Sequence, residues 1–200
     1  MKIVYASLVA LALPVSLLAQ QPQPPAGLVS SPIATVLWTR TIGYQRQLAQ
    51  AFDSIPESLY KYKPTPVQQS IGYVAQHLAT DNYLFCGNFG DMKPTRTAED
   101  TTTADTVKAT WPKAKLVAKL KESFTFCENA IGQIDDAKLA GMFSFSFRGA
   151  PPRQLPRASM VIGHITDMAE HYSQIASYMR LNNMLPPTAL PRPPRPSGGQ

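Results

Sequence analysis

The chain has 200 residues, of which 44% are hydrophobic and 16% charged, a composition typical of one globular domain and unlike that of a disordered chain. Nineteen lysines and arginines against thirteen aspartates and glutamates give a formal charge of +6. The densest basic group, four lysines between 113 and 121, has helical spacing. We therefore expect a solvated helix face there and no nucleic-acid partner.

The first residues have the pattern of an export signal. Lys2 precedes an apolar run from Ile3 to Leu18, and the small residue Ala19 follows at the expected cleavage point. The run is shorter than the roughly 20 apolar residues of a membrane span, and it contains Pro14. We therefore expect removal of residues 1–19 and an exported product, periplasmic or secreted, with no stable membrane insertion after cleavage.

Proline-rich segments flank the expected domain. Residues 20–32 are rich in proline and glutamine and are predicted to form a linker, and residues 186–200 are predicted to form an unpacked, disordered tail. The folded domain should therefore occupy residues 33–185.

Apolar periodicity within this domain predicts helices. The expected ranges are 33–54, 70–89, 112–134 and 157–183. Between the second and third, the polar stretch 91–110 is long for a plain connection and could cover a site. Residues 142–147 alternate as a strand would, and because this is a single segment we expect it to lie extended across the bundle. The fold class is therefore all-α, a four-helix bundle with long crossover connections.

Two of the three histidines lie in the last predicted helix. A helical rotation of about 100° per residue places His164, Asp167 and His171 within an arc of about 60°. Asp167 and His171 are spaced i, i+4, so one cation can meet both side chains. His77 lies mid-way along the second helix, on the turn after the inward-facing Val74.

Helical bundles build metal sites from side chains on facing helices. If the second and fourth helices are neighbours, His77, Asp167 and His171 form a set with open positions for water or substrate, and Asp81 could orient the His77 ring. A histidine on an apolar face is more often an ordinary core or surface residue than a ligand, so spacing alone leaves both interpretations open. His164 lies outside the set and could hydrogen-bond a carbonyl or serve as a catalytic acid or base.

Three segments resemble the DinB-like superfamily, and they follow one another along nearly the whole expected domain. They are Ser-Ile-Gly-Tyr-Val-Ala-Gln-His-Leu at 70–78, Lys-Leu-Val-Ala-Lys-Leu at 115–120, and His-Tyr-Ser-Gln-Ile-Ala-Ser-Tyr-Met-Arg-Leu-Asn-Asn at 171–183 before two prolines. The resemblance implies an up-down-down-up bundle, often a homodimer. It also implies a divalent metal such as nickel, zinc or iron held by three histidines, of which the first matches His77 and the last His171.

The family's middle ligand, four residues before the last, falls on Asp167 in this chain. A carboxylate can ligate a metal, so the site either survives with a different preference or has lost binding. Because a carboxylate is a harder donor than imidazole, a surviving site should accept iron or manganese more readily, beside zinc and nickel.

Two functions follow from these observations. The first is an exported metal-dependent enzyme, a hydrolase or a thiol-dependent transferase, which acts on a small molecule or a low-molecular-weight thiol. The second is a non-catalytic binding or interaction module of the envelope with a vestigial metal site. The chain has no GxSxG motif, so a serine nucleophile has no support.

The chain has two cysteines, which are too few for a disulfide scaffold and lack CxxC spacing. Cys86 lies near the end of the second predicted helix and Cys127 on the inward stripe of the third. Export would place them in an oxidising compartment, where they could pair. Two buried free thiols are the alternative.

Overall fold

A computed structural model describes residues 23–28, 30–146 and 149–191. The expected signal peptide at 1–19 lies outside these residues, as do residues 192–200 of the expected tail. None of the described helices is both long enough and apolar enough to cross a membrane.

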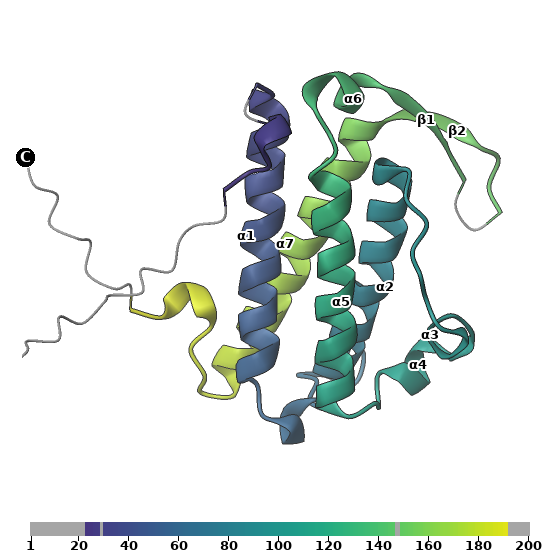
Figure 1. Cartoon of the computed structure of the whole chain (residues 1–200). Helices are drawn as coiled ribbons and strands as arrows, with labels where there is room; N and C mark the ends of the chain where they lie inside the picture. The colour runs from purple at the N-terminus through teal and green to yellow at the C-terminus, as the bar shows by residue number, and fades with distance from the viewer. Residues whose placement is uncertain (1–22, 29, 147–148, 192–200) are drawn as a thin grey trace, which may run out of the picture.

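Among the described residues, the bundle is built by α1 (Pro32–Ser54), α2 (Ile71–Gly90), α5 (Lys113–Ile131) and α7 (Arg157–Leu181). In Figure 1, α1 and α7 run downward whereas α2 and α5 run upward, which is the up-down-down-up order. Helix α2 packs against both α5 and α7, and α1 contacts the same two helices from the other side. The predicted all-α fold is confirmed, and α2 and α7 are neighbours as a shared metal site requires.

Local sequence signals explain where these helices begin and end. Ser70 caps α2, since its side chain accepts a hydrogen bond from the Tyr73 amide, and α2 ends at the left-handed residue Asp91. Pro32 stands in the first turn of α1, where its missing N–H has no helical partner. Because these signals are local, the predicted ends of the long helices differ from the observed ones by no more than three residues.

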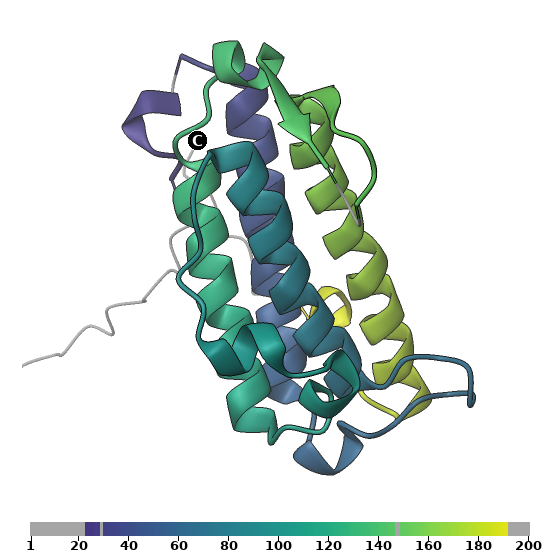
Figure 2. The ribbon, with the colours of Figure 1, turned by 90° about the vertical axis from the view of Figure 1, so that its right-hand side faces the viewer.

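The connection from α2 to α5 is more ordered than its polar composition suggested. It contains two short helices, α3 (Ala98–Thr102) and α4 (Asp105–Lys108), which lie over the outside of the bundle near one end (Figure 2). Thr97 and Asp100 form a reciprocal capping box at the start of α3. This local pairing explains how a polar segment keeps a fixed shape.

The segment expected at 142–147 is extended over Met142–Phe145, and its residue 147 lies outside the described residues. The expectation that it has no partner strand was wrong. Strand β1 (Met142–Phe145) pairs with β2 (Arg153–Pro156) in an antiparallel hairpin, with Phe143 opposite Leu155. The prolines around β2 hid this partner from the sequence pattern. Proline is compatible with a strand at an edge or an end, and β2 is short and followed directly by α7.

Parts of both flanking segments pack on the bundle, in contrast to the expected linker and tail. A turn of 3-10 helix at Ala26–Leu28 places Leu28 in the core. After α7, a second turn of 3-10 helix at Pro187–Ala189 brings Thr188 beside Tyr172. The Tyr172 hydroxyl donates a hydrogen bond to Thr188 Oγ1 at 2.9 Å and accepts one from the Thr188 amide at 3.0 Å. Leu28 and the Thr188–Tyr172 hydrogen bonds are thus among the contacts that hold these two segments on the bundle.

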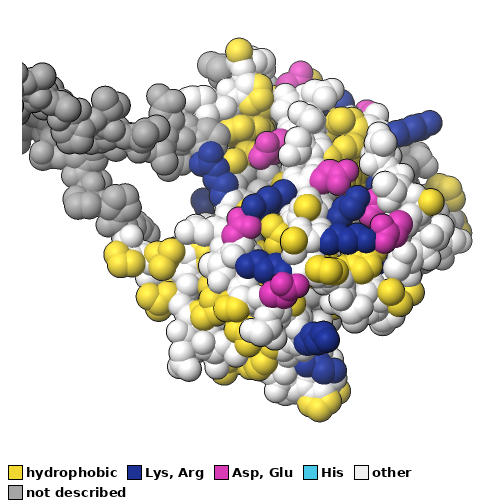
Figure 3. All heavy atoms as spheres, turned by 60° about the horizontal axis from the view of Figure 1, so that its bottom comes forward, with side chains coloured by type: hydrophobic (Ala, Val, Ile, Leu, Met, Phe, Trp, Pro, Cys, Tyr) yellow, Lys and Arg dark blue, Asp and Glu magenta, His cyan; other side chains and the backbone are white. Residues whose placement is uncertain are grey.

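Three of the four lysines of α5 pair with carboxylates. Lys119 Nζ lies 2.8 Å from Asp100, Lys121 Nζ lies 2.8 Å from Asp53, and Lys115 pairs with Glu99. Figure 3 shows positive and negative side chains interspersed on this end of the molecule. These lysines therefore belong to an ion-paired helix face.

Candidate metal centre

Two helices bring His77, Asp167 and His171 together. His77 comes from α2, and Asp167 and His171 come from successive turns of α7. One potential ligand atom from each residue lies within 4.8 Å of the others, and the two imidazole rings meet edge to face with centroids 4.9 Å apart. The structure therefore assembles the three residues that the sequence singled out.

The two oxygens of the Asp167 carboxylate differ in their surroundings. Its Oδ1 lies 3.5 Å from His171 Nε2. Its Oδ2 is buried and has no hydrogen-bond partner among the described residues. Leaving such an acceptor unsatisfied costs on the order of 1–3 kcal/mol. A cation held between the carboxylate and the imidazoles would satisfy it, so the donor set fits a divalent metal.

A chain of hydrogen bonds sets the orientation of His171. Gln174 donates through Nε2 to the Tyr178 hydroxyl at 2.9 Å, and that hydroxyl donates to the carbonyl of Gln69 at 3.1 Å. The Oε1 of Gln174 is thus left to accept from His171 Nδ1, 3.1 Å away. With its proton on Nδ1, the ring presents an unprotonated Nε2 on the side of Asp167.

Gln174 was not predicted to take part in the site. Its i, i+3 spacing from His171 and i, i+4 spacing from Tyr178 place all three on one side of α7. That spacing is a signal that the sequence did contain.

Asp81 lies beside His77, as expected. Its Oδ2 is 3.2 Å from His77 Nε2, an arrangement in which a carboxylate orients a ligating imidazole. Burial raises the pKa of Asp81 above its usual value, although the nearby His77 acts in the opposite direction. For His171, burial favours a lower pKa, but the hydrogen bonds that the protonated ring makes to Asp167 and Gln174 outweigh it and raise that pKa.

An open cleft of about 630 Å³ adjoins the site, and His77 and Asp81 are among the residues that line it. The connection between α2 and α5 also lines it, through Met92, Lys93, Pro94, Arg96 and Asp105. This volume is in the range of small-molecule sites. The polar connection therefore flanks the candidate site.

His164 is placed elsewhere. Its side chain is fully buried, and burial lowers its pKa to about 4. Its Nε2 lies 2.8 Å from Asn82 Oδ1, and it is not part of the His77 group. The position of His164 therefore gives no support to the acid or base role suggested for it, which stays a prediction.

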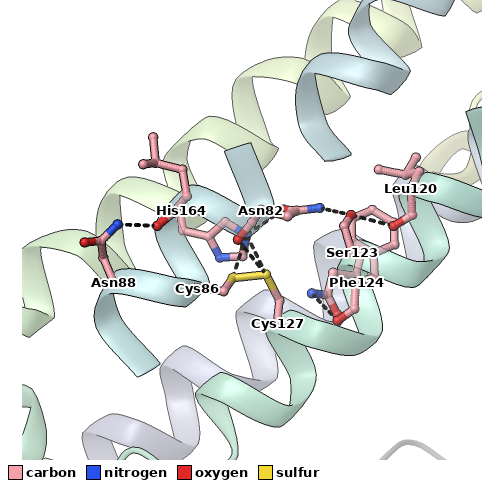
Figure 4. The surroundings of a disulfide bond; sticks show 10 residues. Asn82, Cys86, Asn88, Leu120, Ser123, Phe124, Cys127 and His164 are labelled. Atoms are coloured by element: carbon pink, nitrogen blue, oxygen red, sulfur yellow. Dashed lines mark hydrogen bonds between the residues drawn. A yellow bond between two sulfur atoms is a disulfide. The ribbon is translucent and has the colours of Figure 1, made fainter. Parts of the chain in front are cut away.

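Cys86 and Cys127 form a disulfide that joins α2 to α5, with Cα atoms 5.2 Å apart (Figure 4). Of the two alternatives that the sequence left open, the structure has the bonded pair. The bridge is buried beside His164.

Comparisons with known proteins agree with this architecture. Residues 43–175 match the family model of the DinB superfamily. The chain belongs to the DinB superfamily. No curated protein matches the sequence.

Solved structures share the DinB fold at low identity. A conserved protein from Enterococcus faecalis has a TM-score of 0.57 and 14% identity, over 74% of this chain and 96% of its own. A DinB-like protein from Bacillus cereus has a TM-score of 0.56 and 16% identity, over 72% of this chain and 89% of its own. At such identity the likeness establishes the fold, and function must be argued from the site.

Proposed function

We propose that this DinB-like protein binds one divalent cation through His77, Asp167 and His171 and uses it on a small-molecule substrate. The main support for this proposal is that ligand atoms of two imidazoles and a carboxylate lie within 4.8 Å of one another. One oxygen of that carboxylate is buried without a hydrogen-bond partner among the described residues. Gln174 holds His171 and Asp81 holds His77 in place. Three protein ligands leave positions open for exogenous molecules, as catalytic metal sites require.

The reaction class that suits this site is nucleophilic. A bound divalent cation lowers the pKa of a coordinated water or thiol and so supplies a nucleophile near neutral pH. The cleft beside His77 offers space for the electrophilic substrate, and Lys93 and Arg96 are among the residues that line it. Hydrolysis or transfer to a low-molecular-weight thiol both fit this arrangement.

The test of this function is metal analysis of the purified mature protein, followed by melting curves with zinc, nickel, iron and manganese ions. We expect about one ion per chain and a melting temperature that rises with metal concentration, because a ligand that binds only the folded state stabilises it. Calorimetric titration of the loaded protein with a low-molecular-weight thiol then tests the transferase chemistry, which requires metal-dependent binding of the thiol; absence of such binding would leave hydrolysis.

Absence of any metal-dependent stabilisation would favour the second candidate, a non-catalytic interaction module. The observation on its side is that His171 and Asp167 already interact as an i, i+4 pair. Such a pair can stabilise a helix without a metal.

Export is the second part of the proposal. Lys2, the apolar run to Leu18 and the small Ala19 support it. Mass spectrometry of the protein from its native envelope fraction should show a chain that begins at or near Gln20. A soluble cytoplasmic product with Met1 intact would contradict export.

Gln174→Ala should weaken metal binding by roughly 10- to 100-fold, because His171 would lose the acceptor that fixes its orientation. Isothermal titration with zinc measures the change. Ser173→Ala is the matched control, since the Ser173 side chain is exposed and bonds only within α7, to the Ala169 carbonyl. Equal affinities for the two variants would show that Gln174 does not contribute to metal binding.

Metal affinity should also fall as the pH is lowered. A metal and a proton compete for His171 Nε2, and the pKa of this histidine is raised above the usual value near 6.5. Loss of zinc should therefore begin at a higher pH than for an ordinary histidine and continue as the pH falls. Titrations at a series of pH values test this, and an affinity that stays constant down to about pH 5 would exclude histidine ligands.

A further inference from the structure

A layer of buried polar side chains crosses the middle of the bundle and separates two apolar parts of the core. It takes one residue from each long helix: Gln45, Asn82, Ser123 and His164. The Cys86–Cys127 disulfide lies directly against it (Figure 4). Buried polar groups are costly unless they are satisfied, so a layer of this kind points to a role beyond packing.

One atom of this layer, His164 Nε2, lies close to both cysteine sulfurs and to Asn82. His164 Nε2 lies 3.7 Å from Cys127 Sγ, 3.8 Å from Cys86 Sγ and 2.8 Å from Asn82 Oδ1. The Asn82 amide is fixed in this orientation because its Nδ2 donates to Ser123 Oγ at 2.8 Å. For a tetrahedral zinc ion, the usual bond lengths imply a nitrogen–sulfur separation of about 3.6 Å, close to the distances found here.

We infer that reduction of the Cys86–Cys127 disulfide creates a buried zinc site with both sulfurs and His164 Nε2 as ligands and Asn82 Oδ1 as the fourth donor. The site shares no residue with the His77 group. Because the same sulfurs either bond to each other or hold the ion, the disulfide and the zinc exclude one another.

The charge of this site suits its burial. Two thiolates balance a divalent cation, and a neutral imidazole and an amide add no charge, so the assembled site is neutral overall. Burial keeps His164 neutral at pH 7, since its pKa is lowered to about 4. A neutral cluster avoids the large penalty for an uncompensated charge in the protein interior, which favours a divalent over a monovalent ion.

The chemistry balances with a dithiol as the reductant. The dithiol gives two electrons and two protons to the Cys86–Cys127 bond and becomes a cyclic disulfide, which leaves two protein thiols. Zinc then bonds to both sulfurs, and their two protons pass to solvent. The proton that His164 Nε2 donates to Asn82 in the disulfide form moves to Nδ1, which is buried without a hydrogen-bond partner among the described residues, and Nε2 is then free for the ion.

Cobalt(II) is the probe for the test, because a thiolate bound to it gives a charge-transfer absorption that oxygen and nitrogen ligands do not give. The protein is reduced with a phosphine while unfolded in denaturant; the phosphine gives the two electrons and becomes its oxide, and water supplies the oxygen and the two thiol protons. The reduced chain is refolded by dilution, checked by circular dichroism and titrated with cobalt and then zinc. We expect one thiolate-bound cobalt per reduced chain, displaced by zinc, and none in the oxidised protein. His77→Ala, which disrupts the other group, should leave this absorption unchanged.

His164→Ala should lower the affinity for cobalt at least about tenfold, by loss of a direct ligand. In reduced wild-type protein, zinc should also protect both cysteines from alkylation, a measurement that needs no variant. A reduced, folded chain without the absorption would overturn the inference. So would unchanged binding in His164→Ala, or a reduced chain that does not refold with metal present. Each of these readouts is independent of the function proposed for the His77 group.

Discussion

Replacing His171 by alanine is expected to abolish stoichiometric binding of a divalent cation by the oxidised protein. His171 supplies the one imidazole held by both a carboxylate, Asp167, and an amide, Gln174. Its loss would leave His77 and Asp167 on different helices, and two ligands rarely hold a metal that prefers four or more. Metal analysis after dialysis, together with the metal-dependent shift in melting temperature, measures the effect.

Two further variants test the same set of ligands. Asp167→His should keep the metal and shift preference toward zinc or nickel, because imidazole is a softer donor than carboxylate. His164→Ala should leave occupancy in the oxidised protein largely intact, since His164 lies outside the group. Full metal content in both His77→Ala and His171→Ala would show that the ion binds elsewhere.

The sequence predicted the bundle well because its signals are local. Helix ends follow from prolines, glycines and a capping serine, each of which acts within one turn. The i, i+4 spacing of Asp167 and His171 needed no knowledge of other helices. Placement of His77 opposite them needed the family resemblance, since periodicity does not show which helices become neighbours.

The features that the sequence missed depend on contacts between distant segments. Strand β2 exists because it pairs with β1, and its prolines give no strand signal of their own. Leu28 is fixed by the core, although the segment around it looks like a linker. The polar layer is hidden for the same reason, because Asn82 and His164 are 82 positions apart and each looks like an isolated polar residue on an apolar face.

Removing the disulfide should cost the oxidised protein about 4 kcal/mol of unfolding free energy. The bridge closes a loop between residues 41 positions apart, and the loss of chain entropy in the unfolded state gives this value for a loop of that length. For a domain of this size, the melting temperature of Cys86→Ala/Cys127→Ala should then fall by about 8–16 °C.

Reductant supplies the matched control for this prediction. Wild-type protein reduced after unfolding and measured without metal should melt below the oxidised protein but no lower than the double variant, whereas the double variant should not respond to reductant at all. Because both sulfurs are buried, part of the variant's loss comes from the space they vacate, and the reduced wild type keeps that packing. The difference between the two therefore separates loop closure from cavity formation. A wild-type melting temperature unchanged by complete reduction would show that the bridge adds no stability to the bundle.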